Sequence, residues 1–184
     1  MVQIRGKIRI IGGQWRSRLL TFPEHPDLRP TANRIRETVF NWLGQDLSGL
    51  TCLDLFAGSG ALGFEAASRG AASVVMVDVD ARNIHALREN KEKLQADPVE
   101  LVMMDAFKFL NSDNRTFDVI FLDPPYRSEL FNQIMPLLPQ HLKHNGFVYA
   151  ETNRDWMTDQ QWRTYRSAKA GTVRYQLMEY MNHG

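Results

Sequence analysis

The motif with the clearest chemical meaning is Asp123-Pro124-Pro125-Tyr126, which directly follows the apolar run 119–122. Two consecutive prolines hold the backbone extended and remove two N–H donors, so the neighbouring carbonyl oxygens can point outward as acceptors. Together with the Asp123 carboxylate they form a site that only accepts hydrogen bonds, which suits an exocyclic amino group. Tyr126 adds a flat face on which a nucleobase can stack.

Such a site suits methyl transfer to an aromatic amine. The lone pair of that nitrogen is delocalised into the ring, and acceptors that hold both amino hydrogens favour a pyramidal, more nucleophilic nitrogen. Because a sulfonium leaves readily, the protein needs to supply mainly positioning and electrostatics, and Asp123 can receive the proton during or after transfer. The simpler interpretation of the four residues is an ordinary turn.

A second motif is the glycine series Gly58-x-Gly60-x-x-Gly63, which follows the apolar run 51–56 and opens an Ala-rich segment. Strand, glycine loop and helix in this order bring the backbone close to a ligand. The spacing alone is shared by nicotinamide, flavin and S-adenosylmethionine proteins. Asp54, inside the strand, favours the ammonium and sulfonium of S-adenosylmethionine over a pyrophosphate, unless it only caps a tight turn.

Further acidic residues follow the next two predicted strands. Asp78 lies 20 residues after Gly58, the offset expected of a carboxylate that binds both ribose hydroxyls. Asp80 competes for that role but is expected to cap the following helix. Asp105 can accept a hydrogen bond from an adenine amino group, although each of these residues alone is more often a cap or turn former. The predicted cofactor site comprises Asp54, Phe56, Gly58, Gly60, Asp78, Asp105 and Ala106.

These residues can converge only if the chain alternates strands and helices. From residue 51 the pattern predicts strands at 51–56, 73–78, 99–103, 117–122 and 147–151, with helices at 61–69, 81–94, 105–110 and 129–138. Pro136 is expected to end or kink the last helix. The alternation is typical of a doubly wound, mainly parallel α/β sheet, whose strand ends meet at one edge. Residues 163–168 and 172–181 predict a closing antiparallel hairpin, which is unusual for a nicotinamide-binding domain.

The N-terminal residues predict a basic appendage. Residues 7–11 and 18–22 are expected to form a β-ribbon with arginines on its exposed side. Thr31 is expected to cap a helix that ends at Gly44 and packs through Ile35, Val39, Trp42 and Leu43, which leaves Arg34 and Arg36 for other faces. We therefore divide the chain into a basic ribbon at 1–30 and a catalytic domain at 31–184.

The charge distribution indicates a polyanionic partner. Residues 1–36 hold eight Arg and Lys against two acidic residues, a net charge of +6, so the total of +1 leaves −5 for the rest. A basic segment on a mildly acidic body is typical of nucleic-acid binding, although charges on an exposed edge also prevent aggregation. The predicted RNA-binding residues are Arg9, Arg16, Arg18, Arg34 and Arg36.

Composition bounds the remaining possibilities. A chain of 184 residues that is 43% hydrophobic suits one globular domain with a full core. No run is long enough to cross a membrane and no apolar segment follows the N-terminal charges, so we expect a cytoplasmic protein. We also expect it to be a monomer. The single cysteine, Cys52, is expected in the core. The five histidines offer no ligand set for a metal and are expected at the surface.

Taken together, the motifs resemble those of class I S-adenosylmethionine-dependent amino-methyltransferases, through Leu53-Asp54-Leu55-Phe56-Ala57-Gly58-Ser59-Gly60 and Asp123-Pro124-Pro125-Tyr126. The N-terminal motifs Arg-Ile-Ile-Gly-Gly-Gln-Trp-Arg (9–16), Arg29-Pro30-Thr31 and Arg34-Ile35-Arg36-Glu37-Thr38-Val39-Phe40-Asn41 are more specific. Over nearly its whole length the chain is similar to the bacterial RsmD family, the 16S ribosomal RNA guanine-N2 methyltransferases.

The resemblance implies methyl transfer from S-adenosylmethionine, leaving S-adenosylhomocysteine, to one guanine of 16S ribosomal RNA on the assembled small subunit. Gly58 and Gly60 would then line the methionine part of the cofactor, Asp78 its ribose and Asp105 its adenine, and residues 123–126 would hold the flipped guanine. Asp78 stands where relatives are expected to have Glu, so the resemblance leaves open whether Asp78 or Asp80 binds the ribose.

Four other functions remain open. An adenine-N6 methyltransferase of DNA or RNA, or a protein-glutamine methyltransferase, more often carries Asn in place of Asp123, and the basic ribbon favours nucleic acid over protein. A nicotinamide dehydrogenase is disfavoured by residues 123–126 and by the closing hairpin. A non-catalytic RNA-binding assembly factor would have no need of the acceptor motif.

Overall fold

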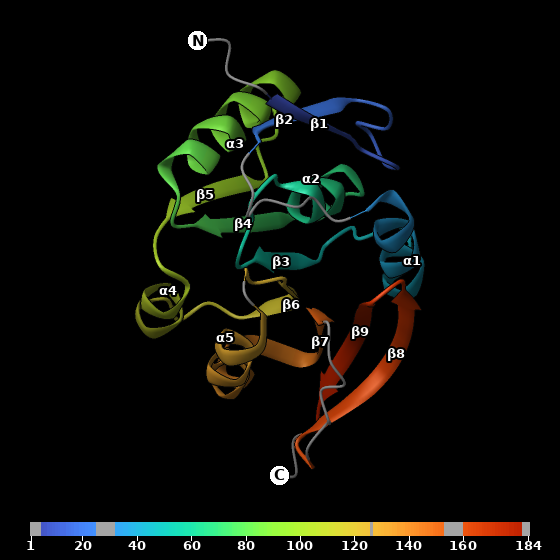
Figure 1. Cartoon of the computed structure of the whole chain (residues 1–184), viewed down its shortest axis with the longest axis vertical. Coiled ribbons are helices and arrows are strands. Elements are labelled where there is room, and N and C mark those ends of the chain that lie inside the picture. The colour runs from blue at the N-terminus through green and yellow to red at the C-terminus, as the bar shows by residue number, and fades with distance from the viewer. Residues whose placement is uncertain (1–4, 25–31, 126, 153–159, 182–184) are drawn as a thin grey trace.

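The computed structural model describes residues 5–24, 32–125, 127–152 and 160–181, which alternate between strands and helices for most of their length (Figure 1). The strands are β1 (Arg5–Arg9), β2 (Leu19–Pro23), β3 (Thr51–Asp54), β4 (Ser73–Asp78), β5 (Val99–Met103), β6 (Phe117–Leu122), β7 (Leu142–Thr152), β8 (Trp162–Ala170) and β9 (Val173–Tyr180). The helices are α1 (Asn33–Leu43), α2 (Ala61–Ser68), α3 (Ala81–Leu94), α4 (Ala106–Ser112) and α5 (Arg127–Ile134), followed by the short 3₁₀ turns η1 (Met135–Leu137) and η2 (Pro139–His141).

The main sheet has seven strands in the order β5-β4-β3-β6-β7-β9-β8. Strands β3 to β7 pair in parallel, whereas β9 pairs antiparallel with both β7 and β8. The prediction of a mainly parallel α/β sheet with a C-terminal antiparallel hairpin is therefore confirmed. The strand order reverses between β3 and β6, which is where open α/β sheets bind their ligands, outside the carboxyl ends of the strands.

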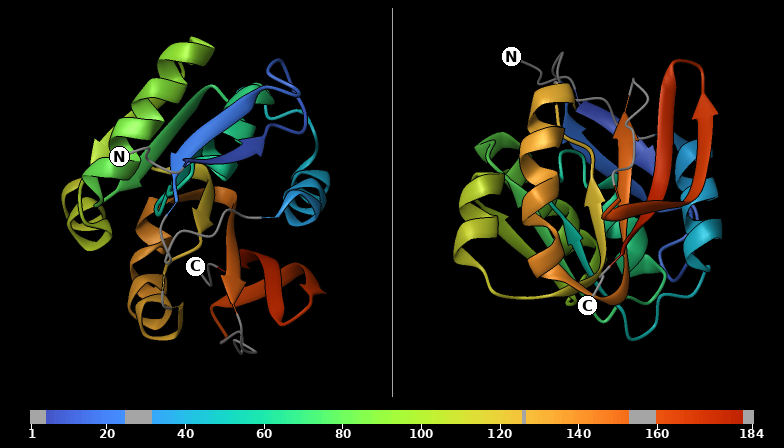
Figure 2. Two further views of the ribbon diagram at one scale, coloured as in Figure 1. Left: turned by 45° about the horizontal axis from the view of Figure 1, so that its top comes forward. Right: turned by 90° about the horizontal axis from the view of Figure 1, so that it is seen from below.

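Alternating side chains of the parallel strands serve two hydrophobic cores. On β4, Val74 and Met76 join the core that also contains residues of α1, α2 and α3, while Val75 and Val77 join the core under α4 and α5. Strands buried on both faces explain why these segments are continuous apolar runs rather than alternating ones. Figure 2 shows the helices on the two faces of the sheet.

The ribbon of β1 and β2 adds a layer outside α2 and α3 (Figures 1 and 2). Strand β1 alternates exposed and buried positions and β2 alternates half-buried and buried ones. Ile8, Leu20 and Phe22 therefore enter the same core as α2 and α3, while Arg5 and Arg9 stay exposed. The predicted ribbon with an exposed basic side is confirmed, with β1 beginning two residues before its expected position.

Helix boundaries differ from the prediction in small ways. Helix α1 begins at Asn33 with Ala32 at the cap position and no side-chain cap bond, while Thr31 lies outside the described residues. At its other end Gly44 has a φ of 82°, as expected of a helix stop. Helix α5 ends at Ile134 and Pro136 lies in the following 3₁₀ turn, because proline cannot donate the next helical hydrogen bond.

Candidate active site

The glycine loop lies between β3 and α2, at the point where the strand order reverses. The amide of Gly60 donates to the Ala57 carbonyl over 2.8 Å, closing a tight turn. Gly60 has a φ of 81°, and a Cβ there would lie 2.6 Å from the Leu87 side chain and 2.7 Å from Phe64. Only glycine fits this position, because its φ is positive and a Cβ would run into the buried core side chains beneath the loop.

Asp78, at the end of β4, is tied to the glycine loop. Its Oδ2 accepts a hydrogen bond from the Gly58 amide over 2.8 Å, and its Oδ1 accepts from the Asp80 amide over 2.8 Å. Asp80 caps α3 by accepting from the Arg82 amide over 2.8 Å, as expected. The geometry therefore places Asp78, rather than Asp80, beside the loop.

Asn83 is a polar neighbour that the sequence did not single out. The side chain is buried, and its Nδ2 donates to Asp78 Oδ1 over 3.3 Å. Its Oδ1 has no hydrogen-bond partner among the described residues. A buried acceptor without a donor is costly, so a hydroxyl-bearing ligand beside Asp78 would satisfy it.

Asp54 is buried at the base of the loop and holds the start of α2. Its Oδ2 accepts from the Gly63 amide over 3.0 Å. Burial raises the pKa of this carboxyl group to about 7, although the Gly63 hydrogen bond opposes the rise and Asp78 adds to it. A cation near the loop would favour the ionised form of Asp54.

The next strand end of the sheet is that of β5. Asp105 caps α4 by accepting from the amides of Phe107 and Lys108, over 2.9 and 3.1 Å, while Ala106 behind it is buried. Two large apolar side chains beside these strand ends were not predicted: Val79 is 72% exposed and Met103 is 60% exposed. Exposed apolar side chains of this size often mark a binding surface, here one suited to a flat aromatic group.

Asp123 follows β6 on the other side of the reversal point and is half-buried, while Pro124 is buried and Pro125 exposed. Tyr126 lies outside the described residues. The Leu122–Ala150 pairing of β6 and β7 brings Glu151 next to Asp123 on the neighbouring strand. Burial raises the pKa of Tyr149, and the carboxylates of Glu151 and Asp123 raise it further.

Glu151 is the second functional candidate that sequence reasoning missed. It is buried, and it accepts a hydrogen bond from the Tyr149 hydroxyl over 3.2 Å. Its sequence signal was present but weak, because a Glu at the end of a predicted strand could equally face solvent. The register thus places two carboxylates, Asp123 and Glu151, at neighbouring positions that follow the paired residues Leu122 and Ala150.

The predicted RNA-binding arginines are spread over the ribbon, its connecting loop and α1. Arg9, Arg16, Arg18 and Arg34 are exposed. Arg9 donates to the Ser17 carbonyl over 2.7 Å and Arg18 to the Lys93 carbonyl over 3.2 Å, contacts that orient the side chains without neutralising their charge.

The prediction that Arg36 binds RNA is wrong. Its side chain is fully buried and pairs with the buried Glu65, at 3.2 Å between Nη1 and Oε2. Glu65 also accepts from the amides of Ile11 and Gly12 and from Arg69, each over 2.9 Å. Through these contacts Arg36 and Glu65 join α1, α2 and the ribbon loop. Because Arg36 has no exposed surface, it is not available to RNA.

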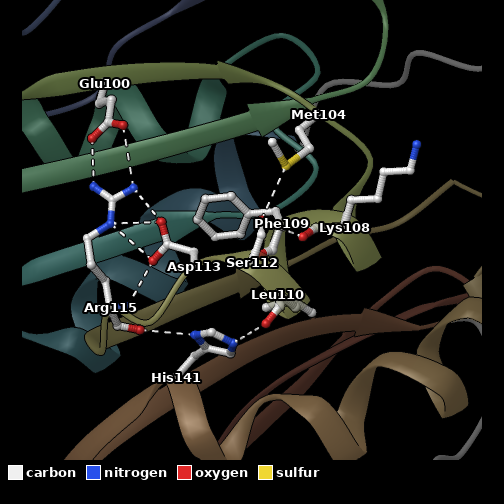
Figure 3. A network of polar contacts seen from close by, with 9 residues as sticks. All are labelled: Glu100, Met104, Lys108, Phe109, Leu110, Ser112, Asp113, Arg115 and His141. Carbon is white, nitrogen blue, oxygen red and sulfur yellow. Dashed lines mark hydrogen bonds and ion pairs between the residues drawn. The ribbon is translucent and has the colours of Figure 1, made fainter.

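The expectation that the histidines lie at the surface is wrong for His141, which is buried. Its ring nitrogens lie 3.0 Å from the Arg115 carbonyl and 2.8 Å from the Leu110 carbonyl, which links η2 to the end of α4 and the start of β6. Figure 3 shows this network, in which the Arg115 side chain pairs with Glu100 and Asp113. Its role is therefore to hold these elements together. Within the described ranges no group of three or more metal-ligating residues forms.

The comparisons with known proteins agree with this architecture. The family model described as "Conserved hypothetical protein 95" matches residues 8–179. The Escherichia coli K12 protein named "Ribosomal RNA small subunit methyltransferase D" is 40% identical over 179 residues, covering 95% of this chain and 90% of that protein. The solved structure of Escherichia coli yhhF has a TM-score of 0.86 at 39% identity, covering 95% of this chain and 98% of that chain. The structure of SMU.776 with S-adenosylhomocysteine, at 20% identity and a TM-score of 0.72 over 95% of this chain and 55% of that one, shares the fold.

Proposed function

This chain belongs to the conserved hypothetical protein 95 family, the RsmD family that its motifs resemble, and from this membership we propose that it methylates small-subunit ribosomal RNA. S-adenosylmethionine is the methyl donor and S-adenosylhomocysteine the product. We propose further that the acceptor is the exocyclic N2 amino group of a guanine, modified on the assembled small subunit. The single observation that carries the finer proposal is the pair of carboxylates, Asp123 and Glu151, at adjacent strand ends.

The crevice suits the cofactor. When bound, S-adenosylmethionine supplies a methyl group on an electrophilic sulfonium. Gly58 and Gly60 of the glycine loop line its methionine part, Asp78 and the unpaired Asn83 Oδ1 accept from its ribose hydroxyls, and Asp105-Ala106 borders its adenine. Phe56 and Asp54 complete the proposed set, with Asp54 acting through the α2 amide that it holds.

The carboxylate pair favours guanine over adenine. The Watson–Crick edge of guanine presents donors at both N1 and N2, whereas adenine presents an acceptor at N1 beside its amino group. A flipped base is read by hydrogen bonds to this edge. Two carboxylates therefore complement guanine and repel the N1 lone pair of adenine, while Pro124, Pro125 and Tyr126 complete the proposed pocket.

The proposed mechanism rests on position and charge. The carbonyl of Asp123 and its carboxylate hold the amino hydrogens, so the nitrogen lone pair faces the donor methyl. As the new N–C bond forms, the nitrogen gains positive charge and loses a proton, for which Asp123 is the nearest proposed acceptor.

RNA binding, by Arg9, Arg16, Arg18 and Arg34, belongs to the same proposal. We propose the division into a ribbon at 1–30 and a catalytic domain at 31–184 as a division of roles. It does not separate two folding units, because the two parts share one core. We propose a monomer that acts in the cytoplasm, where its ribosomal substrate is found. No described helix is long and apolar enough to span a membrane.

The deciding experiment is methyl transfer from labelled S-adenosylmethionine to small ribosomal subunits from a strain lacking this protein, followed by nucleoside analysis. We expect label in N2-methylguanosine on particles and less on naked ribosomal RNA. Label in N6-methyladenosine would overturn the guanine assignment. No transfer despite measurable cofactor binding would favour a non-catalytic assembly factor.

A further inference from the structure

A groove of about 260 Å³ lies between the N-terminal ribbon and the first turns of α3. One wall carries Arg5 and Pro23 at the open end of the ribbon, and the other carries Arg82, His85 and Glu89 of α3. None of these residues belongs to the predicted cofactor or RNA-binding sets. Its volume is slightly below that of most small-molecule sites, which leaves room for a small part of a larger ligand.

The position of the groove links it to the crevice. Helix α3 begins at its cap Asp80, two residues after Asp78, which contacts the glycine loop. Arg82 lies in that first turn, so this end of the groove is close in sequence to the proposed cofactor residue Asp78. The other wall includes Arg5, which starts the exposed basic row of β1. By contrast, the loop with Arg16 and Arg18 lies near the far end of α2, where Gln14 and Trp15 bind Ser68.

The lining has the chemistry of a phosphate and sugar site. Arg5, Arg82 and His85 keep 45%, 61% and 68% of their side chains exposed. Carboxylates hold them in place: Arg5 lies 3.0 Å and His85 3.1 Å from Glu89, and Arg82 lies 2.8 Å from Asp80. Between the two arginines Phe22, Pro23 and Ala86 provide an apolar surface.

We propose that this groove binds the RNA backbone beside the target nucleotide, with Arg5 and Arg82 on its phosphates. The inference rests on the proposed function, because it assumes an RNA substrate whose target base enters the crevice. Phosphate contacts fix the position of a nucleic acid without reading its sequence. The groove would thus set the distance between the backbone and the methyl-transfer site.

The test compares two pairs of arginines in the complete chain. Arg5→Ala/Arg82→Ala removes both groove cations. Arg115→Ala/Arg163→Ala removes two arginines with nearly the same exposure, 44% and 61%, which are also paired with carboxylates. The probe is a fluorescent transcript of small-subunit ribosomal RNA, titrated at several salt concentrations. S-adenosylmethionine affinity is measured in parallel.

We expect the groove pair to lower RNA affinity about tenfold and to reduce the salt slope by about 1.4 to 1.8, the value for two lost phosphate contacts. The control pair should change affinity less than twofold. Equal losses in both pairs would show a net-charge effect and overturn the proposal, as would unchanged affinity in the groove pair. Cofactor affinity should stay the same in all variants.

A change in the opposite direction gives a second test. Glu89 competes with phosphate for Arg5, so Glu89→Gln should strengthen RNA binding several-fold. Glu179→Gln, which releases Arg163 in the same way, is the control. Equal strengthening of RNA binding in both variants would overturn the proposal that this groove binds RNA. Methyl transfer by the unaltered chain, measured on the same particles, shows separately whether the proposed function holds.

Discussion

At the scale of single residues, the two carboxylates at the loop ends of β3 and β6 have different expected roles. Asp54 is buried and holds the Gly63 amide, while Asp123 is half-buried at the proposed base pocket. Environment rather than residue type separates them, because burial penalises the charged form of Asp54 and exposure leaves Asp123 accessible to substrate. Each role leads to its own prediction.

Replacing Asp123 with Ala should slow methyl transfer by about 10² to 10⁴, the usual effect of losing a general base or a charge-stabilising group. Cofactor affinity should be unchanged, because Asp123 lies on the far side of the strand-order reversal from Asp78. Single-turnover transfer to small subunits measures the effect. Asp97→Ala, at an exposed turn, is the control, and a normal rate in Asp123→Ala would refute the assignment.

Asp54 should make folding stability depend on pH. Its pKa of about 7 in the folded protein lies above the ordinary value of 3.8, so the folded state binds more protons than the unfolded state between these values. The free energy of unfolding should therefore fall as pH rises from about 4 to 7 through this residue. Asp54→Asn should flatten that decline, because its side-chain carbonyl still accepts from Gly63 and does not titrate.

Urea denaturation at several pH values tests this prediction. The exposed Asp97→Asn serves as the comparison. Stability curves for Asp54→Asn and the unaltered chain that run parallel between pH 4 and 7 would show that Asp54 does not titrate in this window.

At the scale of elements, most of the fold was readable from local pattern. Strands β4, β5 and β6 and helix α3 have the predicted bounds, since each is a short apolar run or an amphipathic stretch with its own cap. Arg36 and His141 were misplaced because burial of a polar residue depends on partners from distant segments, here Glu65 and the carbonyls of Arg115 and Leu110. Asn83 had no local signal and Glu151 only a weak one for the same reason.

Glu65 is the element-scale junction between α1, α2 and the ribbon loop. Glu65→Gln removes the carboxylate charge that pairs with the buried Arg36 and Arg69, which should lower the free energy of unfolding by about 3–5 kcal/mol, as for other broken buried pairs. Urea denaturation measures the loss. Glu37→Gln, on the exposed face of α1, is the control and should have little effect. A loss of less than about 1 kcal/mol in Glu65→Gln would show that Glu65 does not hold these elements together.

The basic ribbon and α1 should act together on RNA. Replacing Arg16, Arg18 and Arg34 with Ala removes three exposed cations, so RNA affinity should fall and its salt dependence should become shallower by about 2 to 3. Binding titrations over a range of salt measure both changes, with cofactor affinity as the control. An unchanged RNA affinity would remove these arginines from the proposal.

At the scale of the whole molecule, long-range pairing was the least predictable feature. The hairpin of β8 and β9 was expected, but the insertion of β9 between β7 and β8 was not. The same holds for the docking of the ribbon, where Asn90 donates to the Thr21 carbonyl over 2.8 Å and accepts from its amide over 3.2 Å. Such contacts join residues about 70 positions apart in sequence, beyond the reach of periodicity.

Docking of this kind predicts that the ribbon and the catalytic domain fold as one unit. A chain limited to 31–184 would expose the apolar surface that Ile8, Leu20 and Phe22 cover, and would remove two of the amide donors of Glu65. We therefore expect this fragment to lose cooperative unfolding and cofactor binding, in addition to RNA binding. Circular dichroism during urea denaturation and a cofactor titration test this, with the complete chain carrying the Arg16, Arg18 and Arg34 replacements as the control that loses charge alone. A fragment that unfolds cooperatively and binds S-adenosylmethionine normally would instead show the ribbon to be an independent appendage.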